Sequence, residues 1–513
     1  METRPLENLK NQVYFNIIIL VKQGNPMFDP FEKSISEIAE ALENGETSSR
    51  ALVDYYLERV ERFDKNGPAF NSILMVNPNA RLQAELLDEN RKKGKAKGPL
   101  YGLPLLVKDN ANTADMPTTC GCKALAGFRP KKDAFVIGKL REAGAILLAK
   151  TTLSEFTKHG LNCGSLFGQT KNPYDLTRTP GGSSGGTGVA VSANFGVAGI
   201  GSDTVNSVRS PSSACCITGM RPTTGLWSRS GFLPMSELQD TAGPMTRTVA
   251  DIGVLLEACR GYDPADPITA QQAEAAGKAY GDCLKKDGLN GKRIGMLLTN
   301  FGKDTDVRAA MENSASIMRN MGARLVDIDI PEFEADRVLQ EYDVQIYESG
   351  PFIDRYFIEN NAPVSSLREL VKLGVAEKYV QPKLEQCVSI ENPLEHPDYF
   401  RRRFKIQKLR ELAYVVMAEN NLDALCYPHQ QILVEKIGTG SQAGRNGIFA
   451  SVIGFPAITL PGGFSRPEKD APLGIPVGIE FLGRPWSEPL LIELAYSFEQ
   501  ASQFRKYPQS APK

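Results

Sequence analysis

The chain has 513 residues, with 59 Lys and Arg against 60 Asp and Glu, and a formal net charge of −1 at pH 7. Its 42% hydrophobic and 23% charged residues are typical of a globular protein, which excludes an intrinsically disordered chain. The balanced charge gives no electrostatic attraction to nucleic acid or to an anionic membrane surface, so we expect a small-molecule partner.

Residues 1–26 are predicted to form an N-terminal arm of unknown role. The apolar run at 13–21 is interrupted by Asn16 and is much shorter than the roughly 20 residues that span a bilayer. Glu2 and Glu7 precede the run, and no small-residue cleavage site follows it, so a signal peptide is not predicted. We therefore expect a cytoplasmic protein without membrane association.

Downstream of the arm, amphipathic helices alternate with short apolar strands. In chain order the patterns predict a helix over 47–63, a strand at 103–107, a helix within 135–144, a strand at 144–149, a small-residue helix over 186–194, strands at 293–298 and 475–482, and a helix that begins near Ser487. The loop GYDPADP at 261–267 is the best internal breakpoint, but we do not expect it to separate independent domains. This alternation predicts a sheet layered with helices.

The cysteines and histidines do not form a metal or disulfide pattern. The nine cysteines occur singly, as C-x-C or as an adjacent pair, which fits neither a zinc site nor a redox motif. The three histidines, His159, His396 and His429, lack the spacing of metal ligands. We predict reduced, buried cysteines and no metal site.

Residues 180–230 are unusually rich in Gly and Ser. A phosphate-binding loop is excluded because Thr187, not Lys, follows Gly186, and the third glycine of a dinucleotide fingerprint is missing. Ser184 lies in a G-x-S-x-G pattern, which is typical of the nucleophile of an α/β-hydrolase. That reading needs His396 or His429 as the base, and each is more simply explained as a surface or packing histidine.

Several motifs in order resemble the amidase signature family of serine hydrolases. They are GLPLLVKDN at 102–110, TPGGSSGG at 179–186, GSDTVNSVRSP at 201–211, TGMRPTTG at 218–225 and DTAGPMTRTVAD at 240–251. The resemblance implies one large α/β domain over 27–513, with a mixed central sheet between helical layers. It also implies a signature core at about 100–260 and a variable pocket region at about 300–430.

The resemblance implies a catalytic triad of two serines and a lysine. Ser207 matches the nucleophile, Ser183 matches a bridging serine that follows a cis peptide bond from Gly182, and Lys108 matches the base. A lysine can act as a base only when it is neutral, and burial favours the neutral form. Lys108 ends an apolar strand, so we expect it to be buried.

The same resemblance assigns supporting groups. It places the oxyanion hole at the backbone N–H groups of Thr204, Val205, Asn206 and Ser207. It gives Ser184, Asp203 and Arg209 supporting roles. A buried ion pair that braces the loop explains Asp203 and Arg209 equally well.

Val205 and Asn206 replace the two glycines that the family usually has before its nucleophile. Val is strongly disfavoured at positive φ. We therefore predict an ordinary backbone at Val205, and a pocket reshaped by both side chains.

The predicted reaction is hydrolysis of a carboxylic amide through an acyl-enzyme on Ser207, without a cofactor. An ester or a carbamate stays open as the substrate class. A homodimer stays open as the oligomeric state. Three alternatives stand beside this prediction: an amidotransferase subunit that supplies ammonia to a partner, an esterase that uses Ser184 and a histidine, and a catalytically weak binding protein of the same fold.

Overall fold

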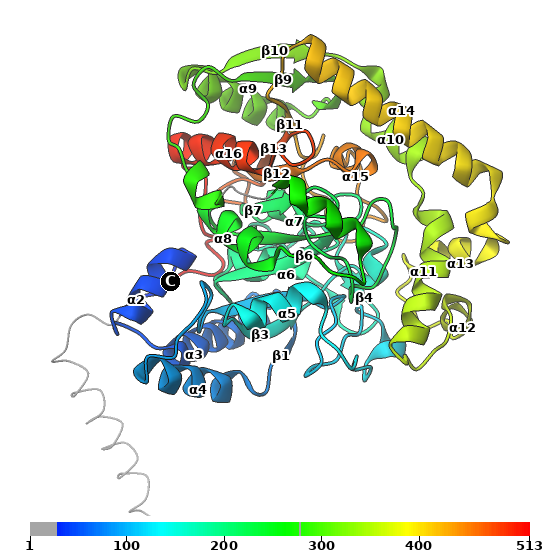
Figure 1. The fold of residues 1–513 in the computed structure, drawn as a ribbon. Coiled ribbons are helices and arrows are strands. Elements are labelled where there is room, and N and C mark those ends of the chain that lie inside the picture. Colours follow the sequence, from blue (N-terminus) through cyan, green and yellow to red (C-terminus); the bar gives the residue numbers. More distant parts are fainter. Residues whose placement is uncertain (1–27, 276–278) are drawn as a thin grey trace, which may run out of the picture.

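An 11-stranded mixed sheet forms the centre of the molecule (Figure 1). The computed structural model describes residues 28–275 and 279–513, so the predicted arm at 1–26 lies outside the described residues. In spatial order the strands are β1 (Ile73–Val76), β3 (Ile146–Thr151), β2 (Pro104–Lys108), β6 (Ala198–Asp203), β8 (Thr241–Thr246), β7 (Thr218–Arg221), β12 (Ala457–Phe464), β13 (Pro476–Leu482), β11 (Ala424–Pro428), β9 (Arg293–Leu297) and β10 (Arg324–Ile328). Strands β4 (Cys163–Gly164) and β5 (Gly168–Gln169) form a separate pair.

The sheet has a parallel section near each edge. Strand β2 pairs parallel with both β3 and β6, and β9 pairs parallel with both β10 and β11. The strands between these sections pair antiparallel. Because β2 and β6 run in the same direction, their carboxyl ends meet at one edge of the sheet.

The structure has helices on both faces of the sheet and further helices beside it (Figure 1). They are α2 (Ile35–Glu43), α3 (Ser49–Arg59), α4 (Ala80–Lys92), α5 (Phe135–Glu142), α6 (Gly185–Ser192), α7 (Arg209–Ala214), α8 (Val249–Cys259), α9 (Thr305–Asn320), α10 (Ala335–Tyr342), α11 (Gln345–Glu359), α12 (Leu367–Lys372), α13 (Gln381–Ser389), α14 (Pro397–Glu419), α15 (Ile448–Ile453) and α16 (Glu488–Ser502). Figure 1 shows α10, α11, α13 and α14 together along one side of the molecule.

Alternate side chains of single strands enter different cores. In β2, Leu105 and Val107 join the core that also holds residues of α3, α5, α8, α9 and α16. Leu106, between them, joins the core that holds Val189 and Val191 of α6. Successive side chains of a strand point to opposite faces, so each face has its own helical layer. The predicted α/β fold with a mixed sheet between helical layers is thus confirmed.

The predicted elements lie where the patterns placed them, within a few residues at their ends. The helix predicted over 47–63 is α3, which begins at Ser49 with Ser48 as its cap and continues as a π-helix over Val60–Lys65. The strands predicted at 103–107, 144–149, 293–298 and 475–482 are β2, β3, β9 and β13. The helices predicted within 135–144, over 186–194 and from near Ser487 are α5, α6 and α16.

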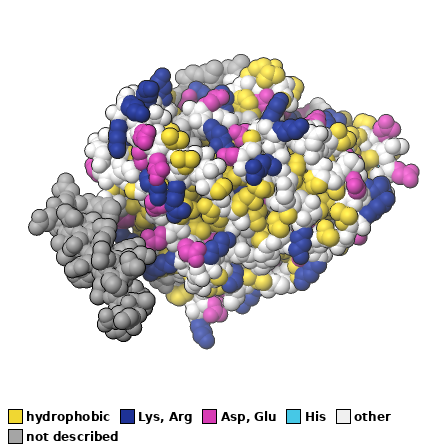
Figure 2. Space-filling model, turned by 90° about the horizontal axis from the view of Figure 1, so that it is seen from below, with side chains coloured by type: hydrophobic (Ala, Val, Ile, Leu, Met, Phe, Trp, Pro, Cys, Tyr) yellow, Lys and Arg dark blue, Asp and Glu magenta, His cyan; other side chains and the backbone are white. Residues whose placement is uncertain are grey.

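The surface has no dominant charge on the face drawn in Figure 2. Basic and acidic side chains are interspersed there, with apolar groups between them. This agrees with the balanced totals of the whole sequence. Among the described residues, no helix combines the length and apolar character needed to cross a bilayer.

The small-residue helix α6 lies unusually close to its neighbours. A Cβ atom added at Gly186 would lie 2.4 Å from the backbone oxygen of Thr152, just after β3. One added at Gly188 would lie 2.9 Å from Pro211 Cβ in α7. The glycines therefore permit the close approach that sets α6 against both neighbours, and with it the serine turn that precedes α6.

This packing predicts opposite effects for two helical Gly→Ala substitutions. Gly186→Ala forces backbone apart, so we expect it to lower the free energy of unfolding by about 1–3 kcal/mol. Gly138→Ala in α5 is the matched control, since its Cβ would meet nothing within 4 Å, and we expect a gain of about 0.5–1 kcal/mol. Chemical unfolding of the two variants measures both changes. Equal midpoints for the two variants would contradict the packing argument.

Candidate active site

The predicted triad residues come from three segments that meet at one edge of the sheet. Lys108 is the last residue of β2, and Asp203 is the last residue of the neighbouring parallel strand β6. Ser207 lies in the short loop that follows β6 and leads into α7. Ser183 lies in the turn before α6.

Lys108 is fully buried and contacts hydroxyl groups instead of carboxylates. Its Nζ donates to Ser183 Oγ at 2.7 Å and to Ser202 Oγ at 2.9 Å. Within the described residues, no carboxylate oxygen lies within 4.0 Å of Nζ. Burial lowers the pKa of Lys108 to about 7, although Asp203 and Asp240 oppose this shift. The side chain therefore changes charge close to neutral pH.

The turn that carries Ser183 is held by a loop that the sequence analysis did not single out. The peptide bond between Gly182 and Ser183 is cis, as the resemblance implies. The Ser183 carbonyl accepts from the Ser154 backbone N–H at 3.0 Å. Asn162 Oδ1 accepts from the Gly185 N–H at 2.8 Å. Neither Ser154 nor Asn162 lies in a recognisable motif, so only the fold reveals their part in placing Ser183.

Ser207 borders a cleft, and its hydroxyl group is not held by a hydrogen bond to the described residues. Its side chain is nearly buried, and its Oγ has no hydrogen-bond partner among the described residues. The Ser207 carbonyl accepts from the Ser184 N–H at 3.1 Å. The structure thus joins Lys108 directly to Ser183, but it does not contain a hydrogen bond between Ser183 and Ser207.

The loop before Ser207 presents a run of free backbone donors. In the described part of the chain, the N–H groups of residues 204–207 donate to no protein acceptor. Val208 N–H, the next one, donates to Asp203 Oδ2 at 3.0 Å. Consecutive unpaired donors beside a serine are suited to stabilise a developing oxyanion.

Val205 and Asn206 both line the cleft. Neither residue has a positive φ, so the predicted ordinary backbone of Val205 is confirmed. The side-chain nitrogen of Asn206 is buried and has no hydrogen-bond partner among the described residues, so both of its N–H groups are unpaired.

Asp203 and Arg209 form the core of a buried ion network. Arg209 Nη2 lies 3.0 Å from Asp203 Oδ1, and its Nη1 lies 2.5 Å from Glu480 Oε1. Arg221 adds a second cation 3.4 Å from Asp203 Oδ1. Burial alone would raise the pKa of Asp203, but Arg209 and Arg221 outweigh it and hold this pKa well below its usual range. The network fixes both ends of the Ser207 loop.

The histidines do not contact the candidate serines. His429 is buried, and its Nδ1 lies 2.6 Å from Glu480 Oε2 in the ion network. His396 is exposed and caps α14. Ser184 Oγ donates to the Ser202 carbonyl at 3.3 Å, and no histidine of the described residues hydrogen-bonds it. The esterase alternative with Ser184 and a histidine therefore has no geometric support.

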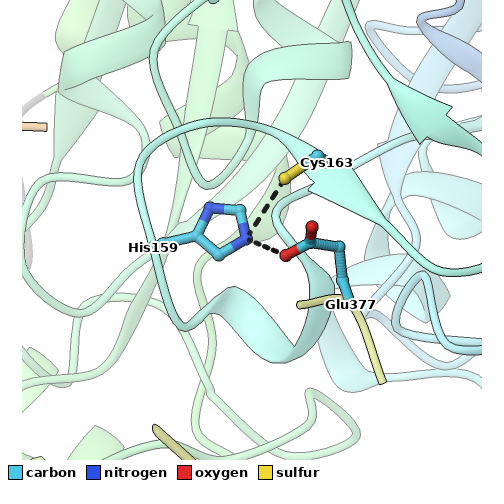
Figure 3. Close-up of side chains that lie close together, drawn as sticks. All are labelled: His159, Cys163 and Glu377. Carbon is cyan, nitrogen blue, oxygen red and sulfur yellow. Dashed lines mark hydrogen bonds and ion pairs between the residues drawn. The ribbon is translucent and has the colours of Figure 1, made fainter. Parts of the chain in front are cut away.

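Three side chains of types that can bind a metal ion lie close together beside the cleft. Figure 3 shows His159, Cys163 and Glu377 converging, with the same ring nitrogen of His159 facing both partners. His159 Nε2 lies 3.6 Å from Cys163 Sγ and 4.0 Å from Glu377 Oε2. His159 Nδ1 accepts from the Leu161 N–H at 3.1 Å, which places the proton of the neutral ring on Nε2. That proton makes Nε2 a donor, so the cluster fits a hydrogen-bonded group better than a metal site.

The cleft has a volume of about 270 Å³, and its lining includes charged side chains. Gly182 and residues 204–207 form the wall that holds the candidate nucleophile. Other lining residues come from much later in the chain, and they are Leu339, Asp343, Gln345, Ile346, Lys383, Gln386, Cys387 and Arg445. Most of these later residues lie within 300–430, the stretch for which a variable pocket region is predicted.

Comparison with known proteins gives matches over nearly the whole chain. The family model described as Amidase matches residues 51–492. The structure of native peptide amidase from Stenotrophomonas maltophilia has a TM-score of 0.88 and 36% identity, covering 95% of this chain and 100% of that one.

Two further matches are components of a larger enzyme, glutamyl-tRNA(Gln) amidotransferase. The matching subunit of this enzyme from Synechococcus sp. (strain CC9605) is 33% identical over 504 residues, which is 94% of this chain and 99% of that protein. The structure of the corresponding subunit from Thermotoga maritima has a TM-score of 0.72 and 25% identity, covering 95% of this chain and 100% of that one.

The buried network predicts a large stability loss for Asp203→Asn. This change keeps the shape of the side chain but leaves Arg209 and Arg221 without their shared anion, so we expect a loss of about 3–5 kcal/mol of unfolding free energy. Asp306→Asn is the matched control, because Asp306 pairs with the largely exposed Arg466 and the expected loss is about 0–1 kcal/mol. Urea unfolding measures both, and a small loss for Asp203→Asn would refute the bracing role.

Proposed function

Since the chain belongs to the amidase signature family, whose members are hydrolases acting on amide bonds, we propose that it cleaves a small carboxylic amide through an acyl-enzyme on Ser207. Lys108 is the base in this proposal, and Ser183 passes the proton of Ser207 to Lys108. The observation that carries the proposal is the 2.7 Å contact of the buried Lys108 Nζ with Ser183 Oγ, without a carboxylate beside it.

The contact of Lys108 with Ser183 supports the first proton transfer, and the transfer from Ser207 to Ser183 is part of the proposal. Neutral Lys108 accepts the Ser183 proton, and Ser183 accepts the Ser207 proton, while Ser207 Oγ bonds to the amide carbon. The carbonyl oxygen becomes an oxyanion, and the free N–H groups of residues 204–207 support its charge. When the C–N bond breaks, the proton returns through Ser183 to the departing amine. Water then attacks the ester on Ser207 by the same route and releases the carboxylic acid.

The shift of the Lys108 pKa supports this use of the side chain. An ordinary lysine is almost fully charged at neutral pH and holds its proton too tightly to act as a base. With a pKa of about 7, roughly half of the Lys108 side chains are neutral at pH 7. The hydroxyl partners accept hydrogen bonds from the charged form and can donate to the neutral one, so they serve both states.

The similarity to a peptide amidase supports hydrolysis of an amide by this chain. That structure matches at a TM-score of 0.88, against 0.72 for an amidotransferase subunit, over the same share of this chain. The amidotransferase role is the second candidate, and the 33% identity to such a subunit favours it. The two differ in whether the purified chain alone turns over simple amides.

Labelling by a serine-directed fluorophosphonate tests the nucleophile. We expect the purified chain to gain one adduct by intact mass, mapped to Ser207, and Ser207→Ala to lose both the adduct and at least about 1,000-fold of amide turnover. Ser184→Ala is the matched control within the same block and should still be labelled at Ser207. An adduct on Ser184 would overturn the proposal, and labelling without turnover of any simple amide would favour the amidotransferase role.

The pH dependence of turnover tests the base. Because only neutral Lys108 accepts a proton, kcat/KM for an uncharged amide should fall about tenfold per pH unit below pH 7 and level off above it. The cleft residue Lys383 also titrates, with a pKa of about 8, so the profile is measured in Lys383→Met as well. We expect the same limb near pH 7 in both proteins. A profile that is flat from pH 5 to 9 in a folded protein would contradict the role of Lys108.

A further inference from the structure

The cleft that holds Ser207 carries an excess of positive charge. Its lining contains three cations, Lys158, Lys383 and Arg445, and one carboxylate, Asp343. All four side chains are half-buried. His159 also lines the cleft, but burial together with Lys383 and Arg445 lowers its pKa to about 3, so it stays neutral.

Lys383 and Arg445 are not neutralised by the protein. Within the described residues, neither side chain has a carboxylate oxygen within 4.0 Å, and the Arg445 guanidinium donates no hydrogen bond. In the part of the chain that the structure describes, Lys383 Nζ donates only to the Lys158 carbonyl, at 3.2 Å. Burial lowers the pKa of both side chains, and Arg445 lowers that of Lys383 further, while Asp343 opposes the shift in each. An anion in the cleft would relieve this repulsion.

Lys158 has a different environment. Its Nζ donates to Ser349 Oγ at 2.7 Å and to Cys387 Sγ at 3.5 Å, which ties it to α11 and α13. It therefore adds positive charge to the wall, whereas the donors of Arg445 are free to bind a ligand. A guanidinium offers two parallel N–H groups that match the two oxygens of a carboxylate.

We propose that Lys383 and Arg445 form a subsite for a carboxylate. The substrate is then a molecule with an amide group at one end and a free carboxylate at the other. This inference rests on the proposed amide hydrolysis at Ser207 and adds the substrate class. A singly charged carboxylate fits better than a phosphate dianion, because Asp343 lies in the same wall and repels the second negative charge. Leu339 and Ile346, also in the wall, suit the hydrocarbon chain between the two ends of the substrate.

Binding to the Ser207→Ala protein tests the subsite without turnover. Calorimetry compares monoamides of straight-chain dicarboxylic acids, from about four to about eight carbons, with amides of monocarboxylic acids of equal length. We expect at least one monoamide to bind roughly 10- to 100-fold more tightly than its uncharged counterpart. Arg445→Gln and Lys383→Met, made in the same background, should each remove most of this preference. Arg445→Lys should keep part of it.

The controls are substitutions of exposed cations outside the cleft lining, Lys372→Met on α12 and Arg319→Gln on α9, which should leave the preference unchanged. The proposal is overturned if no monoamide binds more tightly than its uncharged counterpart, or if the preference survives in the Lys383→Met, Arg445→Gln double variant. Failure of the proposed function is a separate result, because Ser207 labelling and turnover of uncharged amides by the unmodified chain do not depend on the subsite.

Discussion

The chemistry proposed at the carboxyl ends of β2 and β6 depends on one lysine, Lys108, which is shielded from water and has no carboxylate beside it among the described residues. Two buried lysines on neighbouring strands show the contrast. Lys150 of β3 lies 3.0 Å from Asp109, so its charge is paired. Among the described residues, Lys108 of β2 has only hydroxyl and carbonyl oxygens within hydrogen-bond distance. A carboxylate beside Lys108 would stabilise the charged form and remove its capacity to accept a proton near neutral pH.

The buried carboxylates of this region pair with an arginine and not with Lys108. Asp203 and Glu480 are both engaged by Arg209, at 3.0 Å and 2.5 Å, in a region with no solvent access. The Ser207 loop is thereby braced by strong ion pairs. Asp203 affects the pKa of Lys108 through its charge and not through a direct contact. Separation of the two charge systems lets one part of the site be rigid and another part titrate.

The catalytic candidates at the carboxyl ends of the strands are easier to predict from the sequence than the residues that line the cleft. Apolar strands that end in a polar residue, such as 103–107 before Lys108, follow from local patterns, and the motifs gave Ser183 and Ser207 through the family resemblance. The part played by Asn162 was not predictable, because its contact with Gly185 joins residues across a fold that no local pattern specifies. The helices between residues 330 and 400 lacked a readable motif, and Lys383 and Arg445 gain meaning only when α13 and the loop before α15 come together at the cleft.

The cleft is assembled from two separate stretches of the chain. The groups proposed for the chemistry lie between residues 108 and 209, whereas the charged wall lies mostly between residues 339 and 445. Strands β7, β8, β9 and β10 lie between these stretches in the chain and belong to the sheet that both stretches share. Exchange of the later stretch between relatives would therefore alter which molecules enter the cleft while the bond-breaking groups stay in place. Such a layout lets one reaction acquire many substrates through recombination, without renewed selection of the reactive centre.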